Sequence, residues 1–239
     1  MKGAMDAFGR RSFLLRAAAA LAAAAPFSTA RAGAGPVLLC GGSTMAGGFG
    51  NVLADLLAGG GLAARNVARP ATGLARPDHF DWIAHARRLA ARHHPRAAVL
   101  MFGGNDGQAL YAAPGRWVRW EDEDAWSATY RGRIAALCEA LLPAGGPVAW
   151  IGYPIVRLPK LRRRLERINA VARAAMQARP GGTYVDTWDI LADGGRFTAT
   201  KRIGGRVRTI RADDGIHLTT AGARYLARQV HTAIQAAVA

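Results

Sequence analysis

The sequence is poor in cysteine, in acidic residues and in long apolar runs. Only 2 of its 239 residues are cysteine, so disulfides cannot form the main framework of the fold. Because 51% of the residues are apolar and only 20% are charged, a disordered chain is also excluded. No apolar run reaches the ~20 residues that a membrane-spanning helix needs, and we expect no stable membrane span. The sequence predicts an ordinary hydrophobic core.

Acidic residues are outnumbered two to one, with 16 Asp and Glu against 32 Lys and Arg, and the net charge is +16. Such an excess is typical of nucleic-acid-binding proteins. However, no recognition motif accompanies the charge, and the basic residues are scattered. The densest run, at 162–164 with Arg167, has the spacing of one solvated helix face. We therefore expect no nucleic-acid partner.

The first 32 residues have the plan of a signal peptide. Arg10 and Arg11 precede Ser-Phe-Leu, residues 17–25 form a short apolar run, and small residues at 30 and 32 suit a cleavage site. The arginine pair resembles a twin-arginine export signal. The sequence predicts a signal peptide over 1–32 and an exported protein, periplasmic or secreted. An uncleaved amphipathic anchor is the alternative.

Removal of residues 1–32 leaves one domain, 33–239, of 207 residues with a net charge of +12. Cys40 ends an apolar, strand-like run and Cys138 lies in a helix-like one. Both have the surroundings of buried small hydrophobes. A bridge between them stays open, because sequence does not show whether the two thiols meet.

Strand and helix patterns alternate along this domain about five times. The expected strands are 37–40, 62–67, 97–102, 147–151 and 183–185. The expected helices are 49–57, 81–92, 124–142, 158–178 and 219–238, and a two-stranded excursion is expected within 195–210. The alternation predicts an α/β fold with a five-stranded parallel sheet and helices on both faces, a flavodoxin-like three-layer sandwich. Ligands would bind beyond the carboxyl ends of its strands.

Candidate catalytic residues occupy the loops after the strands. Ser43 follows two glycines where the first strand turns into a helix, so its hydroxyl is approachable and lies near backbone amides. Asp214 precedes His217 by three residues and can orient the imidazole as a base. Gly73, after the second strand, and Asn105, after the third, can supply donors to an oxyanion.

The order of these four loops resembles the motif blocks of the SGNH (GDSL-type) hydrolase superfamily. The stretches TGLARPDHFDW (72–82) and DGIHLT (214–219) look like an exported bacterial branch of it. The resemblance implies that Ser43 is the nucleophile, His217 the base and Asp214 the orienting acid. It also implies an oxyanion hole formed by the Ser43 amide, the Gly73 amide and the Asn105 side chain. The family usually has Asp before the serine, where this chain has Gly42.

Together these features predict an exported serine esterase that removes O-acyl groups, such as acetyl, from a cell-envelope or extracellular carbohydrate. Two alternatives stay open: an O-acyltransferase with the same triad, and a non-catalytic carbohydrate-binding protein of the envelope. The positive surface favours an anionic envelope polymer as a further partner. No metal site and no cofactor are expected. Trp117 and Trp120 are candidates for a sugar platform, whereas Trp126 and Tyr130 suit the core equally well.

Overall fold

A five-stranded parallel sheet forms the centre of the domain in the computed structural model, which describes residues 35–239. The predicted signal peptide at 1–32 lies outside the described residues. The strands are β1 (Val37–Gly41), β2 (Ala64–Asn66), β3 (Ala97–Met101), β6 (Val148–Ile151) and β7 (Gly182–Val185). Their order across the sheet is β2-β1-β3-β6-β7, with every neighbouring pair parallel. This order is the flavodoxin-like one, so the predicted fold class is confirmed.

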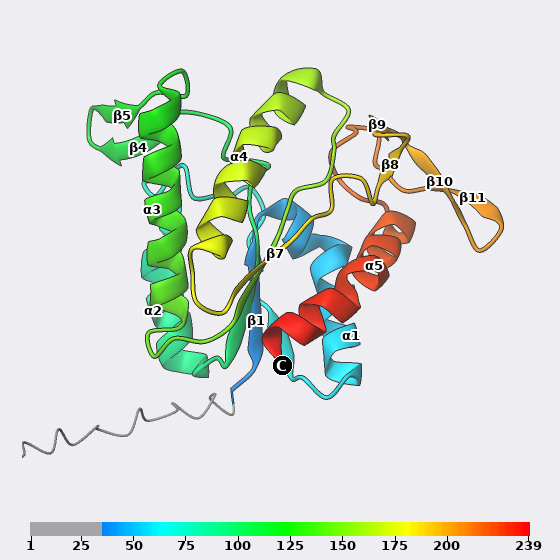
Figure 1. Cartoon of the computed structure of the whole chain (residues 1–239), viewed down its shortest axis with the longest axis horizontal. Coiled ribbons are helices and arrows are strands. Elements are labelled where there is room, and N and C mark those ends of the chain that lie inside the picture. The colour runs from blue at the N-terminus through cyan, green and yellow to red at the C-terminus, as the bar shows by residue number, and fades with distance from the viewer. Residues whose placement is uncertain (1–34) are drawn as a thin grey trace, which may run out of the picture. The chain divides into compact units, whose positions relative to one another are not determined.

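Helices cover both faces of the sheet. One layer contains α1 (Gly50–Gly59) and α5 (Thr220–Val238), which pack against each other (Figure 1). The other contains α2 (Trp82–His93), α3 (Glu123–Leu141) and α4 (Pro159–Gln177), of which α3 contacts both neighbours. Because both faces are covered, β1, β3 and β6 are buried throughout, which explains their unbroken apolar runs.

Side-chain caps fix where three of these helices begin. Asp81 accepts from the Ala84 amide at the start of α2, and Asp122 accepts from the Ala125 amide at the start of α3. Thr219 accepts from the Gly222 amide at the start of α5. Each cap satisfies a first-turn donor that the helix itself leaves free. The cap of α5 comes two residues after His217.

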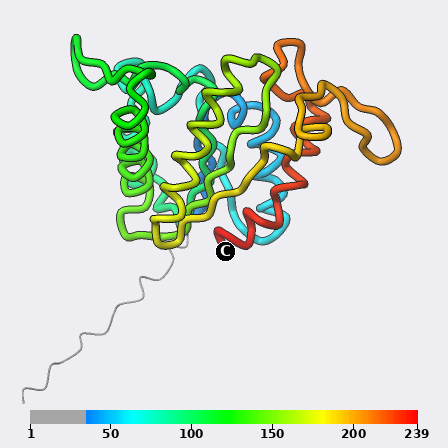
Figure 2. Tube along the Cα trace, turned by 45° about the horizontal axis from the view of Figure 1, so that its top comes forward, coloured from blue at the N-terminus to red at the C-terminus, as the bar shows by residue number. Residues whose placement is uncertain are grey.

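Three small hairpins extend from the loops that follow the strands of the sheet. Figure 2 shows two of them, one green and one orange, projecting from the body of the domain. One pairs β4 (Leu110–Ala113) with β5 (Arg116–Val118), and another pairs β8 (Ala192–Asp193) with β9 (Arg196–Phe197). The third pairs β10 (Thr200–Ile203) with β11 (Arg206–Thr209). The last confirms the excursion expected within 195–210, whereas the β4–β5 hairpin was not predicted.

Both cysteines are buried and free. Cys40 is in β1 and Cys138 is in α3, and neither forms a disulfide. Burial raises the pKa of the Cys138 thiol to about 11, which makes its thiolate scarce at neutral pH. The two therefore act as small core residues, as expected. Within residues 35–239, no helix combines the length and apolar character needed to cross a bilayer.

Candidate active site

Ser43 lies at the junction between β1 and the helix that follows. The Ala46 amide donates to the Gly42 carbonyl at 2.9 Å, so the helical turn begins at Gly42 and includes Ser43. Amides in a first helical turn have no partner inside the helix, and their dipoles attract negative charge. The turn continues through η1 (Met45–Phe49), in which the non-helical backbone of Gly47 (φ −76°, ψ −164°) forms a kink, before α1 begins.

His217 and Asp214 complete a hydrogen-bonded chain with this serine. Ser43 Oγ lies 2.8 Å from His217 Nε2, and His217 Nδ1 lies 2.5 Å from Asp214 Oδ2. The His217 and Asp214 side chains are 44% and 43% exposed, so the chain of hydrogen bonds is open to a substrate. The structure thus brings together three side chains that are 174 residues apart in sequence at their extremes, in the geometry of a nucleophile, a base and an orienting acid.

Asp214 is held in its ionised form. Partial burial opposes ionisation, but hydrogen bonds from the His217 ring and from the Ile216 and His217 amides outweigh it and lower the pKa of Asp214 to about 2. The two amide bonds to Asp214 Oδ1 are 2.7 and 2.9 Å long. They leave Oδ2 facing the imidazole. An ionised carboxylate in this position selects the tautomer whose Nε2 can accept a proton from Ser43.

The loops with Gly73 and Asn105 meet beside the serine loop. The Asn105 side-chain amide donates to the Thr72 carbonyl at 3.0 Å, which places it against the residue before Gly73. It also lies 3.5 Å from the position that a Cβ of Gly42 would occupy. An amide nitrogen carries two protons, so one proton remains for a developing oxyanion. The predicted donors therefore gather at the same edge of the sheet as Ser43.

The replacement of the usual Asp by Gly42 has a steric explanation. A Cβ at this position would lie 2.9 Å from the Thr72 carbonyl oxygen. A side chain here would push the 72–73 loop away from Ser43 unless that loop were built differently. Glycine at 42 thus goes together with the close approach of the Thr72–Gly73 segment in this chain.

Sequence reasoning missed Asp106, whose carboxyl joins the loop that contains Gly73 to the loop that contains Asn105. Its carboxyl is fully buried, accepts from the Ala75 amide at 2.8 Å and from the Tyr130 hydroxyl at 3.0 Å. A Cβ on Gly73 would lie only 2.3 Å from Asp106 Oδ1, so only glycine fits there. Burial raises the pKa of Asp106 to about 6, although these hydrogen bonds oppose the shift. The sequence feature that could have identified Asp106 is its position directly after Asn105.

Arg211 is a second residue that the sequence did not single out. It is 2% exposed and donates to the Ile216 carbonyl at 3.0 Å and to the Ile155 carbonyl at 2.5 Å. It thereby links the Asp214–His217 loop to the segment after β6. Burial lowers the pKa of its guanidinium to about 10, while Tyr153 and Asp214 oppose the shift. Nothing in the sequence distinguishes this arginine from the many others.

Tyr153 supports the serine loop from the same segment after β6. Its hydroxyl lies 2.5 Å from the Thr44 hydroxyl and would lie 2.8 Å from a Cβ on Gly104. Asn169 of α4 fixes Tyr153 through two backbone hydrogen bonds of 2.8 Å each. The residue next to Ser43 and the loop before Asn105 are therefore packed against one rigid tyrosine.

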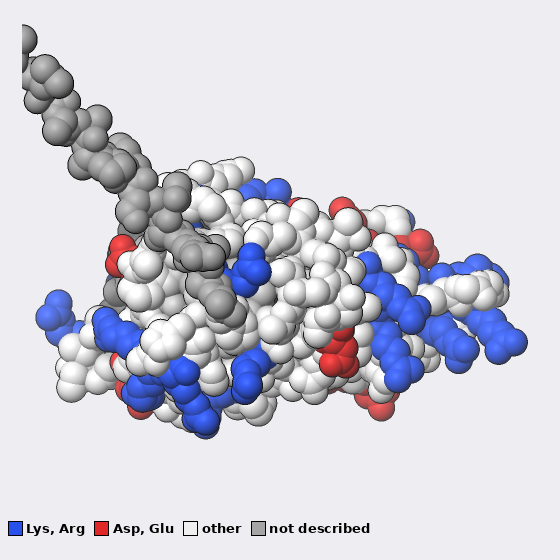
Figure 3. Space-filling model, turned by 90° about the horizontal axis from the view of Figure 1, so that it is seen from below, with Lys and Arg blue, Asp and Glu red and all other residues white. Residues whose placement is uncertain are grey.

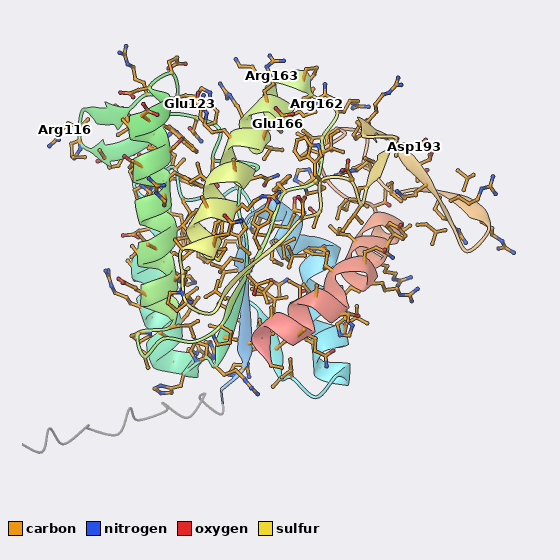
Figure 4. All side chains as sticks on the ribbon, viewed as in Figure 1. Arg116, Glu123, Arg162, Arg163, Glu166 and Asp193 are labelled. Carbon is orange, nitrogen blue, oxygen red and sulfur yellow. The ribbon has the colours of Figure 1, made fainter. Side chains whose placement is uncertain are left out.

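The remaining candidates divide between the core and the rim. Trp126 and Tyr130 are buried, as the core interpretation required, and their rings stack at 4.8 Å. Trp117 is 45% exposed on β5, where the Arg76 guanidinium lies 5.1 Å from its ring. Figure 4 shows charged side chains along this rim, including those of Arg116, Glu123, Arg162, Arg163 and Glu166. Among residues 35–239, no three His, Cys, Asp or Glu side chains cluster in a way that could hold a metal ion.

Comparison with known proteins identifies a family that matches the chain and solved structures with a similar fold. The family described as "Protein of unknown function (DUF459)" matches residues 36–233. A search of curated proteins finds no match. Solved structures resemble the chain only distantly in sequence but along most of its length.

Three solved structures illustrate this low identity over most of the chain. A proposed SGNH hydrolase from Slackia heliotrinireducens is 19% identical with a TM-score of 0.56, over 84% of this chain and 100% of its own. A variant of an acetyl-xylooligosaccharide esterase from a Geobacillus is 19% identical with a TM-score of 0.52, over 82% and 92%. A salicylyl-acyltransferase from a tetracycline biosynthetic pathway is 12% identical with a TM-score of 0.50, over 85% and 56%. At these identities the likeness confirms the predicted SGNH-type fold.

Proposed function

Because this chain belongs to the family DUF459 and has the fold of SGNH hydrolases, we propose that it is an exported serine esterase that hydrolyses O-acyl esters. The observation that carries the proposal is the hydrogen-bonded chain from Ser43 through His217 to Asp214, with distances of 2.8 and 2.5 Å. The substrate we propose is an acylated carbohydrate of the cell envelope or the extracellular space, with acetyl as the leading acyl group.

In the proposed reaction Ser43 Oγ attacks the ester carbonyl carbon while His217 Nε2 accepts the hydroxyl proton. Negative charge develops on the carbonyl oxygen, and the Ser43 amide, the Gly73 amide and the Asn105 side chain would stabilise it. The bond to the sugar oxygen then breaks, and that oxygen takes the proton from His217. Water repeats the sequence on the acyl-enzyme: His217 removes its proton, and Ser43 leaves with that proton as the free acid forms. Asp214 stabilises the protonated imidazole in both halves.

Two observations favour a carbohydrate substrate. Among the fold neighbours is the acetyl-xylooligosaccharide esterase, whose name states a sugar substrate. In addition, Trp117 presents an exposed ring on β5, held by edge contact with Tyr111 at 5.2 Å. Exposed aromatic rings supported in this way can stack on sugars. Export by the predicted signal at 1–32 would bring the enzyme to envelope or extracellular glycans.

Replacement of Ser43 tests the proposal. Ser43 and Ser127 are the two serines within residues 35–239, which makes Ser127→Ala a matched control. We expect Ser43→Ala to lower kcat/KM for p-nitrophenyl acetate by about a thousandfold or more, because the nucleophile is lost. Ser127→Ala, on α3, should stay close to wild type. Equal activity of the Ser43→Ala and wild-type proteins would refute the assignment.

An O-acyltransferase is the second candidate, favoured by the acyltransferase among the fold neighbours. In that case a sugar hydroxyl replaces water as the acceptor of the acyl group. Product analysis with an acyl donor and a polysaccharide separates the two: free acid alone indicates a hydrolase, and an acylated polysaccharide indicates a transferase.

A non-catalytic carbohydrate-binding protein is the third candidate, motivated by Gly42 in place of the usual Asp. Labelling with an organophosphonate decides against it if Ser43 becomes covalently modified. Since the domain holds only two serines, digestion and mass spectrometry of the labelled peptide identify the site directly. No labelling of Ser43 would favour a binding role.

A further inference from the structure

A basic hollow lies beside the candidate active site, between the β10–β11 hairpin and the first half of α5. Its volume is about 570 Å³. Ile203 and Arg208 line it from the hairpin, and Arg224, Tyr225 and Arg228 line it from α5. Figure 3 shows basic side chains gathered at the end of the domain where Figure 1 places this hairpin. Neither the hairpin nor α5 contains an Asp or Glu.

The hairpin turns like charges toward the hollow. Lys201 is paired directly with Arg208, and Ile203 is paired with Arg206. Paired residues of antiparallel strands point to the same face, so all four side chains share the face that Ile203 and Arg208 turn to the hollow. Like charges directly opposite each other destabilise a hairpin. Lys201 Nζ donates to the Ala192 carbonyl at 2.8 Å and lies 5.8 Å from the centre of the Tyr225 ring, but neither contact brings a negative charge to this pair.

The helix adds a second like-charge pair. Arg224 and Arg228 are four residues apart on α5, so they are neighbours on one helix face, and both line the hollow. Every ion pair within 4.0 Å in the described part of the chain lies elsewhere. The β10–β11 hairpin and α5 therefore both direct arginine side chains without a carboxylate partner toward the hollow. Such an arrangement costs stability unless an anion fills it.

The base of the hairpin is joined to the loop that carries His217. Thr219 donates its hydroxyl proton to the Thr209 carbonyl at 2.6 Å, and its amide donates to the Ile210 carbonyl at 3.2 Å. Arg211 and Leu218 form an isolated bridge between the same segments. Thr220, which also lines the hollow, comes three residues after His217. A polymer bound in the hollow thus starts next to the candidate active site.

We propose that the β10–β11 hairpin and α5 form a binding site for an anionic polysaccharide, which holds the polymer while Ser43 acts on its acyl esters. Cations repeated at about 6–7 Å along a strand and a helix suit the repeated charges of a polymer better than one compact anion. Single-stranded nucleic acid would need aromatic stacking platforms. The aromatic ring in the hollow, that of Tyr225, already has Lys201 Nζ 5.8 Å from its centre. The choice of a polysaccharide rests on the proposed esterase function, whereas the basic hollow does not.

Binding to polygalacturonate at low ionic strength tests the site. The protein carries Ser43→Ala, so the measurement does not depend on catalysis, and activity on p-nitrophenyl acetate tests the esterase proposal separately. Arg208→Gln combined with Arg228→Gln should weaken binding roughly tenfold or more and flatten its salt dependence. The matched control, Arg87→Gln with Arg88→Gln, removes the same charge from two exposed residues of α2 and should change the affinity less than about twofold.

Three outcomes of the binding experiment would overturn the proposed site, and a fourth would change its ligand. Equal weakening by both double variants would assign binding to net charge and overturn the site. Absence of binding to polygalacturonate at low salt would overturn it as well, as would binding of neutral dextran with the same affinity. Tighter binding of a single-stranded oligonucleotide, lost in the Arg208 and Arg228 variant, would identify the ligand as nucleic acid instead of a polysaccharide.

Because the substitutions of Arg208 and Arg228 remove like-charge repulsion, the Tm of the double variant should not fall. Arg224→Gln provides a second variant should the double variant fail to fold.

Discussion

Asp106 joins the two loops that carry the proposed oxyanion donors, and its buried carboxyl makes stability depend on pH. Burial raises the pKa of Asp106 to about 6, so between about pH 4 and 6 the folded protein holds a proton that the unfolded chain releases. Stability from this group is present below pH 4 and is lost as the pH rises through 6. We expect wild type to lose about 1–3 kcal/mol relative to Asp106→Asn between pH 4 and 7 in urea unfolding.

The control for this prediction is Asp55→Asn, which changes an exposed carboxyl on α1. Its unfolding free energy should follow that of the wild type across the same pH range. If wild type and Asp106→Asn keep a constant difference from pH 4 to 7, Asp106 does not take up a proton in this range, and the link between its burial and the oxyanion loops has to be reconsidered.

The proposed site residues in loops at strand ends were predictable, and the residues that support these loops through tertiary contacts were not. Ser43, Gly73, Asn105 and His217 follow strands or precede a helix, where parallel topology brings them to one edge. Arg211 becomes important only because Ile155 and Ile216, which are far apart in sequence, both present carbonyls to it. The two carbonyls meet at Arg211 only in the folded chain, so neither residue type nor sequence spacing identifies this arginine.

At the scale of secondary-structure elements, the junction between the His217 loop and α5 depends on Thr219. Its hydroxyl accepts from the Gly222 amide at 3.1 Å and donates to the Thr209 carbonyl at 2.6 Å, so it caps the helix and fixes the base of the hairpin. We expect Thr219→Ala to lower the free energy of unfolding by about 1–2 kcal/mol. Its neighbour Thr220 is the matched control, because it is exposed in the first turn. A cost for Thr220→Ala as large as that for Thr219→Ala would contradict this role.

The strands of the central sheet were predictable from the sequence, whereas one hairpin and the capping residue of α5 were not. The three central strands, β1, β3 and β6, are predictable because burial on both faces requires continuous apolar runs. The edge strands β2 and β7 are only partly buried and lack such runs, and their place in the alternation of strands and helices predicts them. The β4–β5 hairpin escapes prediction because its strands are short, turn at Pro114 and Gly115, and shift register between Tyr111 and Ala113. The hydrogen bond from the Gly222 amide identifies Thr219, and not the adjacent Thr220, as the cap of α5. Caps and bulges depend on one or two contacts, which periodicity does not specify.

At the scale of the whole molecule, the domain over 35–239 is built without a disulfide. Cys40 and Cys138 are buried free thiols, so folding does not need an oxidising compartment. The core is therefore compatible with export after folding, which is what a twin-arginine signal provides. We therefore expect Arg10→Lys combined with Arg11→Lys to hold the protein in the cytoplasm as an uncleaved precursor.

Cell fractionation and N-terminal sequencing check this expectation. Wild type should appear in the periplasm or the medium with a new N-terminus at Gly33, which follows the predicted cleavage after Ala32. Arg16→Lys is the matched control, because it changes a basic residue outside the arginine pair and should leave export intact. If the double variant is exported as well as wild type, the twin-arginine route is wrong. If it is exported and still begins at Met1, cleavage is wrong too, and the alternative of an uncleaved anchor takes its place.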